Sequence, residues 1–155
     1  VAPVKESFDE EIITPEVSKK AKSSEVLIVD DSNIARKQII KTLEKIGVKV
    51  TAANDGKEAL DHLLSLIDQG IDPKEKYAMI ISDIEMPEMD GYTLTTEIRS
   101  NEILKGIHII LHTSLSGVFN KAMVQKVGAD DFLAKFQPDN LAKVVISKIN
   151  PKIET

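Results

Sequence analysis

The chain has 155 residues, of which 42% are hydrophobic and 29% are charged, values that are ordinary for one folded domain with a buried core. Its formal net charge of −5 disfavours direct binding to nucleic acid or to anionic membranes, and the absence of cysteine excludes disulfides and thiolate metal sites. Neither an apolar run of about 18 residues nor a signal-peptide pattern is present, so we expect a cytoplasmic protein without membrane insertion.

Residues 1–24 are polar and acidic, contain two prolines and show no sustained apolar period, which predicts an interdomain linker or a tail. The short apolar piece Ile12-Ile13 can still pack on the body of the protein. Because the chain opens with Val1 rather than Met, we expect a fragment of a longer protein. The remaining residues divide into one domain at 25–150 and a C-terminal tail at 151–155.

The domain begins with Val26 to Val29, a short continuous apolar run that suits a strand buried on both faces. Ser32 or Asn33 can cap a following helix, and Gly47 can end it. A second strand is predicted at 48–53, and a second helix follows. The apolar residues of the two helices recur at helical spacing: Ile39, Ile40, Leu43 and Ile46, then Ala59, Leu60, Leu63, Leu64 and Ile67.

The second half of the chain continues the alternation after a polar loop that contains Gly70 and Pro73. Strands are predicted at 78–81, 107–111 and 131–134, and a helical pattern follows each of them. The apolar stripes of these helices are Leu94 and Ile98, then Phe119, Met123 and Val127, then Leu141, Val145 and Ile149. Five strand–helix units in succession predict a parallel sheet with helices on both faces.

Polar residues follow the carboxyl ends of four predicted strands. Asp30 and Asp31 follow the first, Asp83 the third, Thr113 the fourth and Lys135 the fifth. Taken singly, each has a structural explanation, because an aspartate at a strand end often caps a helix and a lysine is usually solvated. In an open parallel sheet, however, the ligand crevice lies at this edge. The functional argument therefore depends on their convergence.

The residue types at this edge suit phosphoryl chemistry with a hard cation. Three carboxylates in a dry crevice would repel one another unless a cation neutralised them. Mg²⁺ prefers oxygen ligands and combines one or two carboxylates with phosphate oxygens, whereas the three histidines show no zinc-ligand spacing. A carboxylate can act as a nucleophile and form an aspartyl phosphate, and an ammonium and a hydroxyl group can hold the phosphoryl oxygens.

Residues 25–150 resemble the receiver domains of two-component signalling. The resemblance is carried by the sequence segments at 29–32, 82–91, 111–114 and 128–135. It implies a flavodoxin-like (βα)5 three-layer sandwich with a parallel five-stranded sheet in the order 2-1-3-4-5. It also implies a signalling switch that assists only its own phosphorylation and dephosphorylation, rather than an enzyme.

The resemblance also assigns roles to single positions. Asp83 matches the phosphoacceptor, and Thr113 and Lys135 match the residues that assist phosphoryl transfer. Thr113 and Phe132 match the pair that switches conformation. The implied cofactor is Mg²⁺ or Mn²⁺, held by Asp30, Asp31, Asp83 and the backbone carbonyl of Glu85.

The residue after Lys135 differs from that of most receivers, and this difference points to one subfamily. Most receivers have proline after the lysine, typically with a cis bond, whereas Phe136 follows Lys135 here. A cis bond before Phe136 would cost about 2.5–4 kcal/mol, which leaves the conformation of this loop open. The segments 112–120 and 135–139 resemble the receiver of CheV-type chemotaxis coupling proteins. That resemblance implies the histidine kinase CheA as phosphodonor, an upstream CheW-like coupling domain under the control of the receiver, and the chemoreceptor array as partners.

Three other interpretations remain open at this stage. The chain can be the receiver of another response regulator, such as one with a DNA-binding output. It can be an interaction module that keeps the fold without cycling phosphate. The pair Asp83 and Glu85 also superficially resembles the nucleophile and acid of phosphatases that form an aspartyl phosphate, although no cap region is evident.

Overall fold

The computed structural model describes residues 24–114 and 119–149, so the predicted linker up to residue 23 and the predicted tail at 151–155 lie outside the described residues. The strands are β1 (Glu25–Val29), β2 (Lys49–Ala53), β3 (Met79–Asp83), β4 (Ile109–Thr113) and β5 (Asp131–Ala134). The helices are α3 (Asn33–Lys45), α4 (Gly56–Asp68), α5 (Pro73–Lys76), α6 (Gly91–Arg99), α7 (Lys121–Val127) and α8 (Pro138–Ile149).

The five strands form one parallel sheet in the order β2-β1-β3-β4-β5, which confirms the predicted topology. The register aligns the carboxyl ends of the strands. Val29 pairs with Ser82, Asp83 with His112 and Thr113 with Ala134. Residues just beyond these pairs therefore meet at one edge of the sheet.

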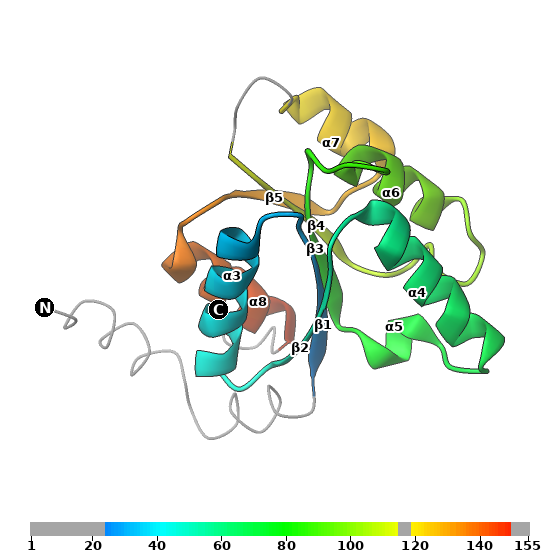
Figure 1. Cartoon of the computed structure of the whole chain (residues 1–155), viewed down its shortest axis with the longest axis horizontal. Helices are drawn as coiled ribbons and strands as arrows, with labels where there is room; N and C mark the ends of the chain where they lie inside the picture. The colour runs from blue at the N-terminus through cyan, green and yellow to red at the C-terminus, as the bar shows by residue number, and fades with distance from the viewer. Residues whose placement is uncertain (1–23, 115–118, 150–155) are drawn as a thin grey trace, which may run out of the picture.

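Helices cover both faces of the sheet and bury two separate cores (Figure 1). On one face, Leu27 and Ile80 pack in a cluster with side chains of α4, α6 and α7. On the other face, Ile28 and Ile81 pack with side chains of α3 and α8. Successive strand residues alternate between the two cores, as the period of a strand requires, and this explains why the central strands are apolar throughout.

Short polar side chains set the starts of the helices. Ser32 caps α3 by accepting from the backbone N–H of Ala35 at 3.2 Å, and Asp90 caps α6 in the same way. Helix α5 was not predicted, because four residues are too few to show an apolar period, although Pro73 at its start fits the preference for proline there. Strand β4 begins at Ile109 rather than 107, since Ile107 is buried within a turn. None of the helices in the described ranges is long and apolar enough to cross a membrane.

Candidate functional site

The acidic pair Asp30 and Asp31 lies just beyond the end of β1. In a regular strand the two side chains would face opposite sides of the sheet. The strand ends at Val29 and the chain bends at Asp31, so both carboxylates reach the same point. Asp30 is fully buried, and its Oδ1 accepts from the backbone N–H of Ser32 at 2.8 Å. Asp31 is exposed at the mouth of the site.

Asp83, the last residue of β3, lies between the acidic pair and Lys135. Its Oδ1 accepts from the backbone N–H of Ile84 at 2.8 Å, which fixes the orientation of the carboxylate. The Lys135 Nζ lies 3.2 Å from Asp83 Oδ2 and 3.2 Å from Asp30 Oδ2. One ammonium group therefore bridges two buried carboxylates that come from different strands.

The site opens into a cleft with a volume of about 310 Å³, lined by Asp31, Asp83, Ile84, Glu85, Thr113, Ser114 and Lys135. Thr113 is buried at the end of β4. Phe132 points to the core side of β5, where its ring lies 5.0 Å from that of Phe119. The structure thus brings Thr113 and Glu85 to the cleft, while Phe132 lies away from it.

The charges at the site shift the pKa values of its groups. Burial, and then the charge of Asp30, raise the pKa of Asp83 to about 6, although Lys135 and the Ile84 N–H act in the opposite direction. Burial acts to lower the pKa of Lys135, but the two carboxylates outweigh it and leave that pKa above its ordinary value. Burial, and then the charge of Lys135, lower the pKa of His112 to about 4, so this histidine is neutral near neutral pH.

The donor set fits a divalent cation. Oxygen atoms of Asp30, Asp31 and Asp83 all lie within 4.8 Å of one another. Asp30 Oδ2 is buried, and its charged neighbour is the Lys135 ammonium at 3.2 Å, although the contact does not have full hydrogen-bond geometry. A carboxylate oxygen has two lone pairs, so this oxygen can still bind a cation beside Lys135. Carboxylate oxygens in this arrangement are ligands that Mg²⁺ and Mn²⁺ prefer.

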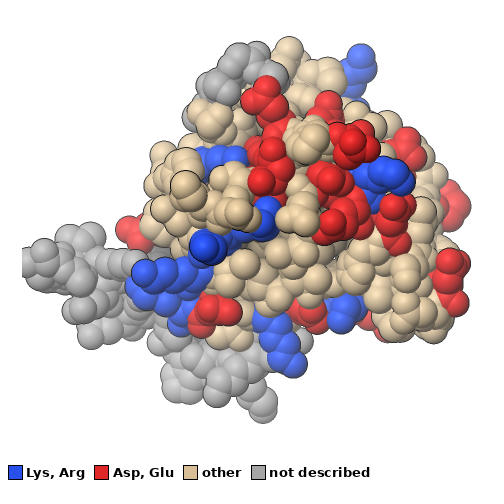
Figure 2. All heavy atoms as spheres, viewed as in Figure 1, with Lys and Arg blue, Asp and Glu red and all other residues tan. Residues whose placement is uncertain are grey.

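Acidic side chains also gather on the surface around the β3–α6 loop and the start of α4, whereas Lys and Arg side chains lie over α3 (Figure 2). The negative potential of this acidic surface attracts cations to the mouth of the site and repels free anions. Lys135 is the positive group among the residues that line the cleft, and it partly offsets this negative charge.

Two features of the site were not found from the sequence. Gly91 lies so close to the third strand that an added Cβ would stand 2.2 Å from the carbonyl oxygen of Asp83. No sequence signal distinguishes a glycine of close approach from a turn glycine. Phe136 has a φ of 63°, and the described residues contain no cis peptide bond, so the bond before it is trans. This answers the question, left open by the sequence, of the conformation of the loop after Lys135.

Known proteins resemble the chain over the same region. Residues 26–146 match the model of the response regulator receiver domain family. Chemotaxis protein CheV1 of Helicobacter pylori is 33% identical over 120 residues, which is 77% of this chain and 36% of that protein. Chemotaxis protein CheV3 of the same organism is 35% identical over 129 residues, covering 83% of this chain and 41% of that protein. The chain therefore spans less than half the length of these two curated relatives.

Solved structures agree with this assignment. The chemotaxis protein CheY4 of Vibrio cholerae superposes with a TM-score of 0.66 and 32% identity, covering 79% of this chain and 95% of that chain. A signal receiver domain of a histidine kinase from Syntrophus aciditrophicus gives a TM-score of 0.68 with 31% identity over 84% of this chain and 92% of that chain. The family match, these relatives and the parallel sheet with its acidic edge agree, and the chain belongs to the response regulator receiver domain family, a signalling switch fold.

Proposed function

We propose that Asp83 accepts a phosphoryl group from the phosphohistidine of a histidine kinase, with a divalent cation at the acidic pair. The observation that carries this proposal is the position of the Lys135 ammonium, 3.2 Å from a carboxylate oxygen of both Asp30 and Asp83. In this arrangement one buried carboxylate can react, while its neighbours supply the charges that a transferring phosphoryl group needs.

Each residue has a separate role in this mechanism. A carboxylate oxygen of Asp83 attacks phosphorus, the P–N bond of the donor breaks, and the imidazole nitrogen takes the electron pair and a proton. Lys135 binds one phosphoryl oxygen, and the Thr113 hydroxyl and backbone N–H groups of the cleft bind others. Asp30, Asp31, Asp83 and the carbonyl of Glu85 would hold Mg²⁺ or Mn²⁺, which when bound neutralises the acidic groups and binds a phosphoryl oxygen.

A small acyl phosphate tests this step without any protein partner. The chain is incubated with the donor and Mg²⁺, and the intact mass is measured. We expect an adduct of one phosphoryl group that disappears in Asp83→Asn and in the presence of EDTA. An adduct that survives Asp83→Asn would contradict the assignment. A chain that neither binds Mg²⁺ nor forms an adduct would be the non-cycling interaction module.

The switch would connect Thr113 to Phe132. The new phosphoryl group draws Thr113 and Lys135 toward Asp83, and the space left behind Thr113 admits the ring of Phe132. This ring is half-buried and packs against Phe119 at 5.0 Å between centroids. Because the chain has no tryptophan, Phe132→Trp provides a single tryptophan whose emission can be excited selectively. We expect its emission to change with the phosphodonor in the Thr113 chain and not in Thr113→Val, and an unchanged emission in both would refute this coupling.

The kinase would be the chemotaxis kinase CheA, and the chain would be the receiver of a cytoplasmic CheV-type coupling protein. The support is the likeness to CheV1 and CheV3. An upstream CheW-like domain would then connect the receiver to the chemoreceptor array. Purified CheA carrying labelled phosphohistidine should transfer label to the chain faster than an unrelated histidine kinase does. Equal or slower transfer would favour the receiver of a different response regulator.

A further inference from the structure

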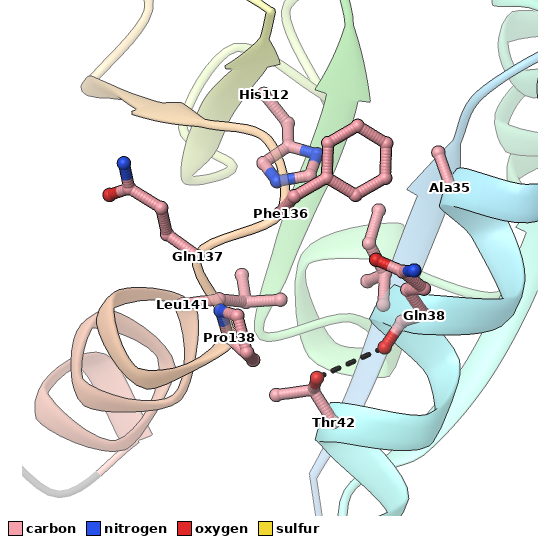
Figure 3. A pocket seen from close by; sticks show the side chains of 9 residues that line it. Ala35, Gln38, Thr42, His112, Phe136, Gln137, Pro138 and Leu141 are labelled. Carbon is pink, nitrogen blue, oxygen red and sulfur yellow. Dashed lines mark hydrogen bonds between the residues drawn. The ribbon is translucent and has the colours of Figure 1, made fainter.

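A groove lies between α3 and the start of α8, on the face of the sheet opposite α4. It is lined by Gln38, Ile39 and Thr42 of α3, by Phe136 and Leu141, and by His112 (Figure 3). We call it the α3–α8 groove. Its walls contain both apolar and amide or hydroxyl side chains. The enclosed space at the bottom of the groove is only about 20 Å³. That space holds one water-sized group, so an occupant would lie across the groove rather than inside it.

Two features of the groove are unfavourable in the structure as described. Phe136 exposes 57% of its surface and adopts a φ of 63°, a left-handed conformation that costs a non-glycine residue about 1–2 kcal/mol. His112 is 97% buried, as its exposed fraction of 3% shows, yet its Nδ1 has no hydrogen-bond partner. An exposed phenyl ring and an unsatisfied buried nitrogen in one groove indicate a surface that is completed by something bound over it.

We propose that residues 5–14 of the same chain dock in the α3–α8 groove. This segment reads Lys-Glu-Ser-Phe-Asp-Glu-Glu-Ile-Ile-Thr. On a helix Phe8 and Ile12 would lie four residues apart on one face, and Asp9 and Glu11 would border that face on either side. The apolar face of the segment fits the exposed ring of Phe136, and the space of about 20 Å³ beneath the segment leaves room for one water beside His112.

The charges of the two surfaces are complementary. The segment carries four acidic residues, Glu6, Asp9, Glu10 and Glu11, and one lysine. Helix α3 exposes Lys37 and Lys41, which flank Gln38 on the helix surface. Figure 2 shows Lys and Arg side chains over α3, away from the acidic surface around α4. An acidic segment is therefore attracted to the side of the molecule that contains the groove and repelled from the other side.

The chain is long enough for this contact. Thr14 and Ser24, which directly precedes β1, are ten residue steps apart in the chain. Fully extended they reach roughly 35 Å, whereas a five-residue strand such as β1 is only about 17 Å long. The segment can therefore pass from the amino end of the sheet to the groove. Phe136 directly follows Lys135, so docking there places the segment next to the phosphoryl site.

Disulfide trapping tests the proposal, because the chain contains no cysteine of its own. In the full chain, Ile12→Cys is combined with Gln38→Cys in the groove. The matched control combines Ile12→Cys with Asp61→Cys on α4, whose side chain is 63% exposed on the opposite face of the sheet. In a glutathione buffer we expect the groove pair to close at least about ten times faster than the control pair, as a raised effective concentration requires.

Charge reversal gives an independent measurement on the same pair. Asp9→Lys with Glu11→Lys should slow closure severalfold, and adding Lys37→Glu with Lys41→Glu should restore it. Equal closure of the groove and control pairs would overturn the proposal. Disulfide-linked dimers in place of closed monomers would also overturn it and would instead assign the groove to a second copy. None of these measurements requires phosphorylation, so their outcome is independent of the function proposed above.

Discussion

Asp83→Asn is expected to stabilise the metal-free chain at about pH 8, although it removes the residue that we propose to be phosphorylated. Burial and the charge of Asp30 raise the pKa of Asp83 from 3.8 to about 6, and only 6% of the residue is exposed. The folded chain therefore binds this proton more tightly than the unfolded chain does. The cost of the ionised carboxylate is fully present above about pH 6, declines as the pH falls, and is absent below about pH 4.

The magnitude follows from the same shift. A rise from 3.8 to about 6 corresponds to about 3 kcal/mol of unfolding free energy at 1.36 kcal/mol per pKa unit. Asparagine loses the ion pair with Lys135 but can still accept the hydrogen bond from the Ile84 N–H, so the turn after β3 is retained. We expect a gain of about 1–3 kcal/mol at pH 8 that disappears near pH 4.

Urea denaturation of both chains in EDTA, at about pH 8, 6 and 4, measures this difference directly. Asp61→Asn is the matched control, because this carboxylate is exposed on α4, and its free energy of unfolding should change by no more than about 0.5 kcal/mol. Added Mg²⁺ should reduce the gain, since a ligand of the native site stabilises only the chain that binds it. A loss of stability at pH 8, or a gain that stays the same at pH 4, would refute the electrostatic reasoning.

Three further substitutions distinguish a residue of the phosphorylation site from residues that stabilise the fold around it. Lys135→Met should slow phosphorylation by an acyl phosphate by about 10²–10³-fold, and an unchanged rate of adduct formation would contradict its role as an oxyanion partner. Gly91→Ala should cost about 3 kcal/mol in urea denaturation, because the new Cβ would stand 2.2 Å from the carbonyl oxygen of Asp83; a neutral result would mean that the backbone relaxes. Arg99→Met should also cost about 3 kcal/mol, since Arg99 donates to three backbone carbonyls and to the carboxylate of Asp130. These contacts lie at the amino ends of β4 and β5, so the phosphorylation rate of Arg99→Met should persist, and its loss would show that the two ends of the sheet are coupled.

The fold was predictable because strand and helix periods alternate cleanly in this chain. The run at 26–29 is apolar throughout, and the structure explains this by a core on each face of the sheet. The convergence of Asp30 and Asp83 followed from topology alone, because parallel strands end at one edge. The sequence could not predict burial. Asp30 is fully buried beside Lys135 whereas Asp31 is exposed, and this difference depends on where β1 ends. Helix α5 and the close approach of Gly91 also depend on contacts rather than on local pattern.

The unusual loop after β5 shows how the site tolerates Phe136 in place of proline. Thr113 pairs with Ala134 in the sheet, and the Lys135 N–H donates to the Thr113 carbonyl at 2.8 Å. The position of Lys135 is therefore set by strand pairing that precedes the unusual residue. The chain turns at Lys135 and Phe136, and the left-handed φ of 63° is at Phe136. The ammonium group remains 3.2 Å from both carboxylates, so the departure alters the surface beside the site while the charged centre is retained.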